Sequence, residues 1–430
     1  MKEKYLINAR ILDPKNNLDE IGGLIIDSKG LIKASGKKVT NGNLPSSANK
    51  IDLKKHILMP GIVDMRVFIG EPGYEYKENF RTLSDAALSG GVTSVVSMPN
   101  TSPAIDNVSM VDFLKRRGRD KSKINVFPSA TLTKDAKGKQ MTEFGLLKRK
   151  GIIAFTDGIK SIQDPEVMSR IMNYASQSKS LIIQHAEDNI LSKDGLINEG
   201  EISTRLGLKG IPFLAEKIIV ERDLSFLEEY FCRYHISQIS SKNTVSVIKK
   251  AKNEDKIFTT GVSINNLCLN ENDIGDFKTF LKLSPPLRTE SDRQSLVESI
   301  NDGTIDVIVS DHNPQDEESK RLTFAQAATG ASGIETLLPL ALELFHNKSV
   351  SLKKLIASIT SNPAKILNIN KGSLDIGNDA DLCIFDINKP WIVDKSKLRS
   401  KSKNTPIENR KLQGQVLKTF VKGELLYESI

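Results

Sequence analysis

The sequence has few cysteines and no long apolar run, and both absences narrow the class of protein. Its three cysteines, Cys232, Cys268 and Cys383, are too few and too widely spaced for a disulfide framework or a thiolate zinc motif. We expect them to be buried in a protein of the reducing cytoplasm. No segment approaches the ~20 uninterrupted apolar residues of a membrane span. No apolar stretch follows Met1-Lys2-Glu3-Lys4, so we expect no secretory signal and no membrane contact.

Dense basic regions are also scarce. The 430 residues carry 61 Lys and Arg against 53 Asp and Glu, a net charge of +8 that comes mostly from scattered lysines. The one compact basic stretch, Lys395–Lys403, has no interleaved aromatic residues, and the chain has no RNP-like or helix-turn-helix pattern, so we expect no nucleic-acid binding. We expect this stretch to be a solvated loop, with contact to an acidic partner surface or to phosphate as the alternative.

The central part of the chain alternates apolar runs with segments of helical period, such as Asn79–Leu88, Met110–Arg117 and Asp292–Ile300. Eight strands separated by helices predict a parallel sheet, and that number is typical of a closed (β/α)8 barrel of the TIM type. The continuous hydrophobicity of several runs indicates strands that are buried on both faces. The predicted strands are Ile57–Asp64, Val92–Met98, Ile124–Pro128, Ile152–Asp157, Leu181–His185, His235–Ser240, Ile257–Val262 and Ile305–Ser310.

The two ends of the chain have a different pattern. Short strand-like pieces occur at Tyr5–Ile11 and Gly23–Ser35 and again at Leu382–Asp386 and Val416–Tyr427. Neither end has enough apolar residues for a core of its own, so we expect both ends to pair into one small β domain beside the barrel. The expected division is 1–55 plus 370–430 for the β domain and 56–369 for the barrel.

In such a barrel the chemistry is found where strands end and βα loops begin. The residues expected there include Arg66 and Phe68 after the first strand, Asn100 after the second and Asp157 at the end of the fourth. The later strands contribute, in order, His185, Gln238, Asn265 with Asn266, and Asp311 with His312. These residues are therefore the candidate site.

Ordered motifs around these positions resemble those of the dihydroorotase family of the amidohydrolase superfamily. The resemblance implies an amidohydrolase (β/α)8 barrel and a place in pyrimidine (UMP) biosynthesis. In that family zinc polarises the carbonyl of dihydroorotate and supplies hydroxide, and an Asp after the eighth strand transfers the proton. The segments that carry the resemblance are Met59–Met65, Met98–Thr101, Phe155–Gly158, His185–Asp188, Ser284–Arg288, Asp311–His312, Gly333–Thr336, Ser361–Ala364 and Ala380–Leu382.

Several positions depart from the family pattern. The family's His-x-His pair after the first strand is Arg66-Val67-Phe68 here, and the Arg that holds the substrate carboxylate is Gly70. The ligand His of the sixth strand is Gln238. The family's His-His after strand seven is Asn265-Asn266, and the second member of its Asp-Asp pair is Gly158. The resemblance therefore leaves His185 and Asp157 as remnant ligand positions, Asp311 as the vestigial proton-transfer position and Asn100 as a substrate-binding position.

These replacements oppose metal binding. Zinc takes lone pairs from imidazole, thiolate or carboxylate, and neither Phe68 nor Arg66 offers one. A guanidinium about 5 Å from a zinc dication would be repelled by on the order of 7 kcal/mol at an effective dielectric near 20. The chain has five histidines, and only His185 matches a family ligand position. We therefore expect no cofactor, with zinc expected only if the protein is an active enzyme.

The role of Arg66 has two alternatives in the sequence. Its guanidinium either occupies the former metal position and pairs with Asp157 or Asp311, or points into solvent at the barrel mouth. His185 is expected to form a hydrogen bond at its strand end rather than to bind metal. For Asp311, capping of the following turn and a retained proton-transfer role are both open. Asn100 either holds its turn or contacts a ligand.

Three functions remain open. The first is a catalytically impaired dihydroorotase-like subunit, a pseudoenzyme that assembles with aspartate carbamoyltransferase and supports its oligomer, as similar zinc-less homologues do. The second is an active dihydroorotase that hydrolyses dihydroorotate to N-carbamoyl-L-aspartate with one metal on Asp157, His185 and Asp311. The third is a repurposed cyclic-amide hydrolase or ligand-binding barrel, with a polar pocket formed by Arg66, Asn100, Asn265 and Asn266.

Overall fold

A closed parallel barrel makes up the larger part of the molecule, in a computed structural model that describes residues 2–40, 42 and 49–429. Its eight strands follow one another in chain order and every neighbouring pair is parallel. The Phe68 N–H donates to the His312 carbonyl at 2.9 Å and closes the barrel between its last and first strands. The strands are β6 (Ile62–Val67), β7 (Val92–Ser97), β8 (Asn125–Ala130), β9 (Ala154–Phe155), β10 (Leu181–His185), β13 (Arg233–Ser237), β14 (Thr259–Ser263) and β15 (Val307–Val309).

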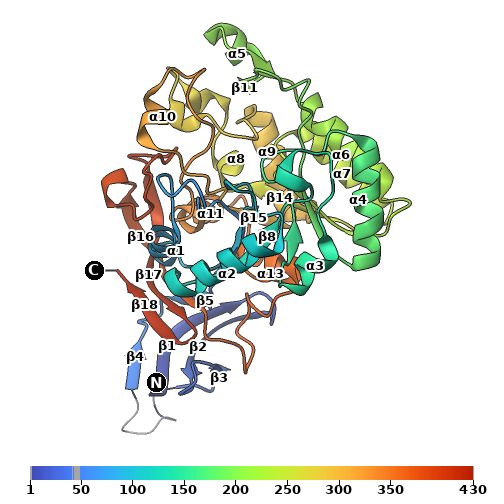
Figure 1. Ribbon diagram of the computed structural model, residues 1–430. Helices are drawn as coiled ribbons and strands as arrows, with labels where there is room; N and C mark the ends of the chain where they lie inside the picture. The colour runs from blue at the N-terminus through green and yellow to red at the C-terminus, as the bar shows by residue number, and fades with distance from the viewer. Residues whose placement is uncertain (1, 41, 43–48, 430) are drawn as a thin grey trace.

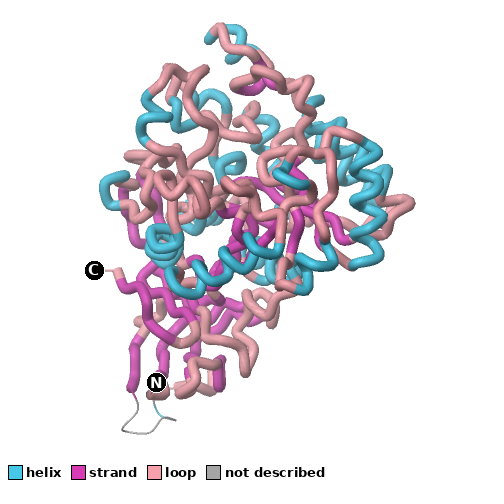
Figure 2. The backbone as a smooth tube through the Cα atoms, in the orientation of Figure 1, coloured by secondary structure: helices cyan, strands magenta, loops and turns pink. Residues whose placement is uncertain are grey.

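Helices surround the strands, as the tube drawing shows (Figure 2). Both faces of the barrel wall are therefore buried, which explains the continuous apolar runs of the sequence. The longer helices are α1 (Phe80–Ser89), α2 (Val108–Lys121), α4 (Pro165–Ser178), α6 (Leu214–Phe226), α7 (Lys242–Asn253), α9 (Glu290–Asp302), α11 (Leu337–His346), α12 (Leu352–Ile359) and α13 (Ser361–Leu367). Shorter ones are α3 (Phe144–Arg149), α5 (Glu201–Leu206), α8 (Ile264–Cys268) and α10 (Glu317–Arg321). Helix α5 projects from the body beside β11 (Ile197–Asn198), which pairs with β12 (Gly210–Ile211) (Figure 1).

Strands from both chain ends form a second, eight-stranded sheet, as the sequence predicts (Figure 1). The order is β18-β17-β16-β5-β1-β2-β3, with β4 paired to β1. The N-terminal and C-terminal halves of this sheet meet where β16 runs antiparallel to β5. Its strands are β1 (Lys4–Asp13), β2 (Leu18–Ile26), β3 (Ile32–Gly36), β4 (Asn49–Asp52), β5 (Ile57–Pro60), β16 (Leu382–Ile392), β17 (Lys411–Val421) and β18 (Glu424–Glu428).

One predicted strand, Ile57–Asp64, is in fact two strands in different sheets. The chain leaves the β domain after β5 and enters the barrel as β6, with Gly61 between them. A Cβ at Gly61 would lie 2.1 Å from the Thr93 hydroxyl oxygen, so the crossing needs glycine. The β sheet thus extends to Pro60, beyond the predicted boundary at residue 55. Because the apolar run is unbroken, its hydrophobic pattern does not reveal the change of sheet.

A second correction concerns the predicted strand Ile257–Val262. The observed strand β14 starts at Thr259, and Ile257 precedes it with 87% of its surface exposed. The residue is apolar but lies at the open base of the barrel, where the strands begin.

None of the helices in the described part of the chain is both long and apolar enough to cross a bilayer.

Two aromatic side chains illustrate how the barrel core is packed. Phe155 of β9 stacks on Phe144 of α3 with ring centroids 3.9 Å apart, and both are fully buried. We expect Phe155→Ala to lower the free energy of unfolding by about 3–5 kcal/mol, through lost transfer energy and the cavity left behind. The measurement is the midpoint shift in urea unfolding. Phe231, which is 86% exposed, is the matched control, and Phe231→Ala should change stability by less than about 0.5 kcal/mol. Equal effects at the two positions would contradict this packing.

Candidate functional site

A buried ion pair joins the first and last strands at the mouth of the barrel. The Arg66 Nε donates to Asp311 Oδ1 at 3.0 Å, and its Nη1 donates to the Gly158 carbonyl at 3.3 Å. Only 6% of the Arg66 side chain and 10% of the Asp311 side chain are exposed. The predicted pairing of Arg66 with Asp311 is therefore confirmed, and the alternative in which Arg66 points into solvent is wrong.

The carboxylate of Asp64 bonds to the backbone next to both partners. Asp64 of β6 accepts the Arg66 N–H at 3.1 Å and the Ser310 N–H at 3.3 Å, so one side chain connects the ends of β6 and β15. Burial raises the pKa of Asp64 to about 6, against hydrogen bonds from Ser310 and Arg66 that favour the charged form. Asp64 thus fixes the backbone that carries both members of the ion pair.

Asp311 is a buried carboxyl group whose charge is stabilised mainly by Arg66. Burial raises its pKa above the ordinary value, while the charge of the Arg66 guanidinium lowers it. Its backbone has φ +52°, a left-handed conformation that is uncommon for a residue other than glycine. The Asp311 side chain accepts its hydrogen bond from Arg66 through Oδ1.

Asp157 does not take part in this pair. Its Oδ1 accepts the Thr133 N–H at 3.0 Å and its Oδ2 accepts the Thr133 hydroxyl at 2.5 Å. Burial raises the pKa of Asp157, and these two bonds oppose that effect. The prediction that Arg66 pairs with Asp157 is wrong, because Thr133 satisfies this carboxylate. No local sequence pattern marks Thr133, which lies between β8 and α3.

His185 is buried at the end of β10 and forms the strand-end hydrogen bond that the sequence predicts. Its Nε2 lies 3.3 Å from the Ser284 hydroxyl. Burial, and then the positive charge of Arg66, lower the pKa of His185 to about 3, so the ring is neutral at pH 7. Because the Arg66 guanidinium is already positive, a second positive charge on His185 would be unfavourable.

The remaining candidate residues place unpaired polar atoms around this centre. Both amide atoms of Gln238, Oδ1 of Asn100 and Nδ2 of Asn265 are buried and have no hydrogen-bond partner among the described residues. Phe68 instead packs its ring 5.9 Å from that of Tyr74. Asn266 donates to the Pro286 carbonyl at 3.0 Å. The barrel mouth therefore keeps hydrogen-bonding capacity that the protein itself does not use.

Comparison with known proteins places this geometry in a family. The dihydro-orotase-like family matches residues 55–244 and the amidohydrolase family matches residues 308–427. The dihydroorotase of Ehrlichia canis (strain Jake) is 40% identical over 426 residues, which cover 99% of this chain and 95% of that protein. The dihydroorotase of Syntrophus aciditrophicus (strain SB) is 42% identical over 423 residues, covering 98% and 99%. This chain belongs to the dihydroorotase family.

Solved structures support the fold. The L-hydantoinase (dihydropyrimidinase) of Arthrobacter aurescens superposes with a TM-score of 0.89 at 23% identity, covering 100% of this chain and 96% of that one. The dihydropyrimidinase of Brevibacillus agri NCHU1002 gives 0.86 at 20% identity, covering 99% and 95%. At these identities the likeness shows the architecture alone, a (β/α)8 amidohydrolase barrel with a β domain.

The donor set at the barrel mouth does not fit the zinc ion of dihydroorotases. Arg66 and Phe68 offer no lone pair to a metal. The Arg66 guanidinium also donates a hydrogen bond to the Asp311 carboxylate. Within residues 2–40, 42 and 49–429, no group of three or more His, Cys, Asp or Glu side chains is arranged to hold a metal. Of the remnant positions, Asp157 bonds to Thr133 through both oxygens. His185 contacts Ser284 through Nε2, and its Nδ1 is buried without a hydrogen-bond partner among the described residues.

Two glycines beside this site lie in crowded positions with left-handed backbones. A Cβ at Gly158, which replaces an Asp of the family pair, would lie 2.8 Å from the Asn100 side chain, and its φ is +74°. A Cβ at Gly70, which replaces the family's substrate-binding Arg, would lie 2.3 Å from the Glu78 carbonyl oxygen, and its φ is +83°. A side chain at position 70 would require neighbouring backbone atoms to move, and one at position 158 would displace the Asn100 side chain.

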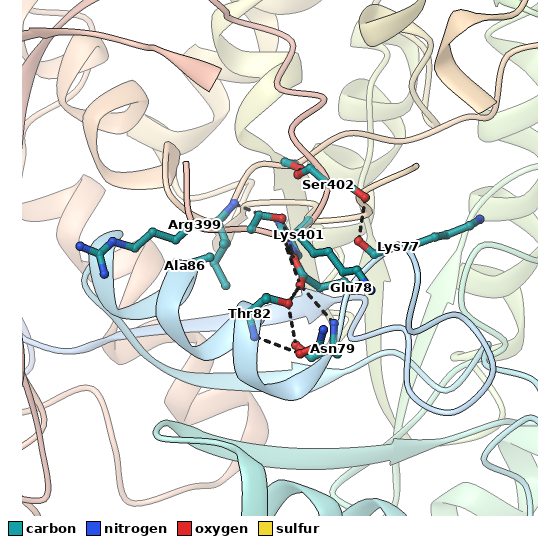
Figure 3. Close-up of polar contacts among 12 residues, drawn as sticks. Lys77, Glu78, Asn79, Thr82, Ala86, Arg399, Lys401 and Ser402 are labelled. Atoms are coloured by element: carbon teal, nitrogen blue, oxygen red, sulfur yellow. Dashed lines mark hydrogen bonds and ion pairs between the residues drawn. The ribbon is translucent and has the colours of Figure 1, made fainter. Parts of the chain in front are cut away.

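A buried glutamate beside this site, Glu78, has no role predicted from the sequence. Glu78 is fully buried and accepts hydrogen bonds from the Ser400 hydroxyl at 2.5 Å, the Lys401 N–H at 3.3 Å and the Thr82 hydroxyl (Figure 3). The His312 Nε2 lies 3.4 Å from it. Burial would raise the pKa of Glu78, but His312, Ser400 and Thr82 together lower it, so the carboxylate is charged.

Glu78 explains the conformation of the basic stretch Lys395–Lys403. The prediction of a solvated loop fits the lysines of this stretch but not its serines, because Ser400 and Ser402 are buried. The Ser400 hydroxyl donates to Glu78, and the Ser402 hydroxyl donates to the Lys77 carbonyl (Figure 3). The Arg399 side chain points away from this cluster, over the Tyr427 ring. The stretch is thus a strap that is fastened to the barrel mouth, with its cations facing outward.

The energetic role of the Arg66–Asp311 pair can be measured with a double-mutant cycle. Asp311→Leu or Arg66→Met alone leaves one buried charge unpaired, and each should lower the free energy of unfolding by about 3–5 kcal/mol. The double variant should be more stable than the sum of the two losses predicts, because no charge stays uncompensated. Urea unfolding measures all four proteins.

The exposed pair Arg10–Asp19 is the matched control, with side chains 39% and 46% exposed. The same cycle with Arg10→Met and Asp19→Leu should give at most about 1 kcal/mol of coupling, since exposed ion pairs contribute little. Strictly additive losses at Arg66 and Asp311 would contradict a buried, mutually dependent pair.

Proposed function

We propose that this chain serves pyrimidine biosynthesis as a dihydroorotase-family subunit that does not hydrolyse dihydroorotate through zinc. The observation that carries the proposal is the ion pair between Arg66 and Asp311. It puts a permanent cation at a former ligand position and engages the carboxylate that the family uses for proton transfer. A carboxylate held in this way cannot accept a proton from water or donate one to a leaving group without first releasing Arg66.

The substrate side of the site supports the same proposal. Gly70 stands where the family has the Arg that binds the substrate carboxylate, and its surroundings exclude a side chain. Phe68 presents an apolar ring where a ligand would be required. Loss of the metal position and loss of the carboxylate-binding position are independent changes, and both act against turnover.

We further propose that the protein acts as an oligomeric scaffold for aspartate carbamoyltransferase. The support is the preserved fold: the barrel, the composite β sheet and the family segments persist although the ligand positions have changed. Selection on an interface maintains a fold without maintaining its metal site. The test is size-exclusion chromatography with light scattering of the two purified proteins, alone and mixed. A joint species with raised carbamoyltransferase activity is expected, and separate elution at micromolar concentration would refute the scaffold role.

The second candidate function is an active zinc-dependent dihydroorotase. It is favoured by the names of the curated relatives, which are dihydroorotases at about 40% identity over nearly the whole chain. The comparisons support this alternative better than they support a scaffold. The two candidates make opposite predictions for metal content and for hydrolysis of dihydroorotate by the native protein.

A variant with three histidines at the replaced ligand positions distinguishes the two candidate functions. In the proposed function, native protein purified with excess zinc contains little metal and shows no dihydroorotate hydrolysis. The variant Arg66→His, Phe68→His, Gln238→His should bind about one zinc per chain, because imidazole donors then replace the cation, the ring and the amide. Turnover should stay low, since Gly70 is unchanged. Elemental analysis and a spectrophotometric hydrolysis assay give the two readouts.

The matched control is Arg66→Met, Phe68→Leu, Gln238→Leu, which removes the same three side chains without adding a ligand. It should bind no more zinc than the native protein. Stoichiometric zinc in the native protein together with robust turnover would establish the active enzyme and refute our proposal.

A further inference from the structure

Helix α6 carries large apolar side chains on its solvent-facing side as well as on its buried side. On the inner side, Ile219 and Leu224 are buried in the core of the barrel. On the outer side, Leu214 and Ile218 lie one turn apart and are 42% and 43% exposed, and Phe213, just before the helix, is exposed too. A surface helix ordinarily presents polar residues to water, so the outer side of α6 departs from the usual pattern.

The neighbouring helix α7 follows that usual pattern. The two helices pack against each other on the outside of the barrel (Figure 1). The exposed residues of α7 are all polar: Lys242, Ser246, Lys250 and Asn253. The apolar outer side is therefore a feature of α6 and not of the helical layer around it.

An ordered turn adds apolar surface beside the start of α6. The Asp188 N–H donates to the Ala215 carbonyl at 2.8 Å, and Asp188 Oδ1 accepts the N–H groups of Ile190 and Leu191, each at 2.9 Å. Both apolar side chains are exposed, Ile190 by 83%. Gathered apolar residues of this kind mark protein–protein contact sites. We call the five residues the α6 patch: Ile190, Leu191, Phe213, Leu214 and Ile218.

The charges that α6 presents to solvent are one cation and one anion. Lys217 Nζ lies 3.4 Å from Glu221 Oε1, one turn further along, and both side chains are partly exposed. An exposed pair at this spacing contributes only about 0.3–0.5 kcal/mol, so both groups can change partners at little cost. Arg222 instead bonds inward, to the carbonyls of Ile162 and Gln163.

We propose that the α6 patch binds the α6 patch of a second copy of this chain, with the two α6 helices antiparallel across a two-fold axis close to Ile218. Such an interface uses the same residues on both sides. Reversing the helix direction brings Lys217 of one copy opposite Glu221 of the partner subunit, so the outer side of α6 is complementary in charge to itself. A partner of a single charge sign would match only one of these two groups.

The test is sedimentation velocity of the full-length protein alone, from about 1 to 100 μM. We expect a dimer of twice the chain mass of 47.5 kDa. Ile218→Glu should raise the dimer Kd about thirtyfold or more, because it places a carboxylate at the centre of the apolar contact. The matched control is Ile376→Glu, at an isoleucine that is 72% exposed and lies in the β domain, and it should leave the dimer unchanged.

Charge reversal tests the antiparallel arrangement. Lys217→Glu and Glu221→Lys should each raise the dimer Kd about tenfold, because each places like charges opposite one another at two symmetric positions. The double variant Lys217→Glu, Glu221→Lys exchanges the two charges and should restore the native affinity. Both residues lie on the outer side of the helix, so this series does not depend on how Ile218→Glu folds.

The proposal concerns copies of this chain only, so its failure leaves the carbamoyltransferase scaffold untouched. A chain that is monomeric at about 100 μM would overturn it. So would an equal loss of affinity in the two isoleucine variants, or a double charge variant that does not recover. A native monomer whose joint species with aspartate carbamoyltransferase is abolished by Ile218→Glu would assign the α6 patch to that enzyme instead.

Discussion

The contact between the Arg66 guanidinium and the Asp311 carboxylate determines what the barrel mouth can do. Where a metal ion would neutralise the carboxylate of Asp311, here a side chain of the protein does so at 3.0 Å. The ion pair needs no further counter-charge, because each group offsets the desolvation free energy of burying the other. Neighbouring groups fit this centre: His185 stays neutral beside the cation, Asp157 turns to Thr133, and Asp64 holds the two strands that carry the pair.

Much of the fold could be predicted from the sequence because barrel strands and amphipathic helices leave clear periodic patterns. The alternation of strands and helices and the pairing of both chain ends were both predicted correctly. The division of Ile57–Asp64 between two sheets could not be predicted, since the residues on both sides of Gly61 are equally apolar. The exposure of Ile257 was missed for a related reason: hydrophobicity indicates burial on average, but here the residue precedes the strand at an open edge.

The site was less predictable than the fold, because its contacts join residues that are distant in the chain. Sequence reasoning identified Arg66 and Asp311 as potential partners, yet it could not choose between Asp311 and Asp157, a choice that depends on where Thr133 lies. Likewise, Lys395–Lys403 reads as a charged loop. Its serines are buried only because Glu78, far away in sequence, provides an acceptor for them. Contacts of this kind depend on tertiary structure, which local patterns do not encode.

The glycines at positions 70 and 158 restrict which substitutions the barrel mouth can accept. A Cβ at position 70 would lie 2.3 Å from the Glu78 carbonyl oxygen, and one at position 158 would lie 2.8 Å from the Asn100 side chain; both residues have left-handed backbones. Protein engineering at either position therefore has to redesign a neighbour as well, the chain segment that carries Glu78 in the first case and the side chain of Asn100 in the second.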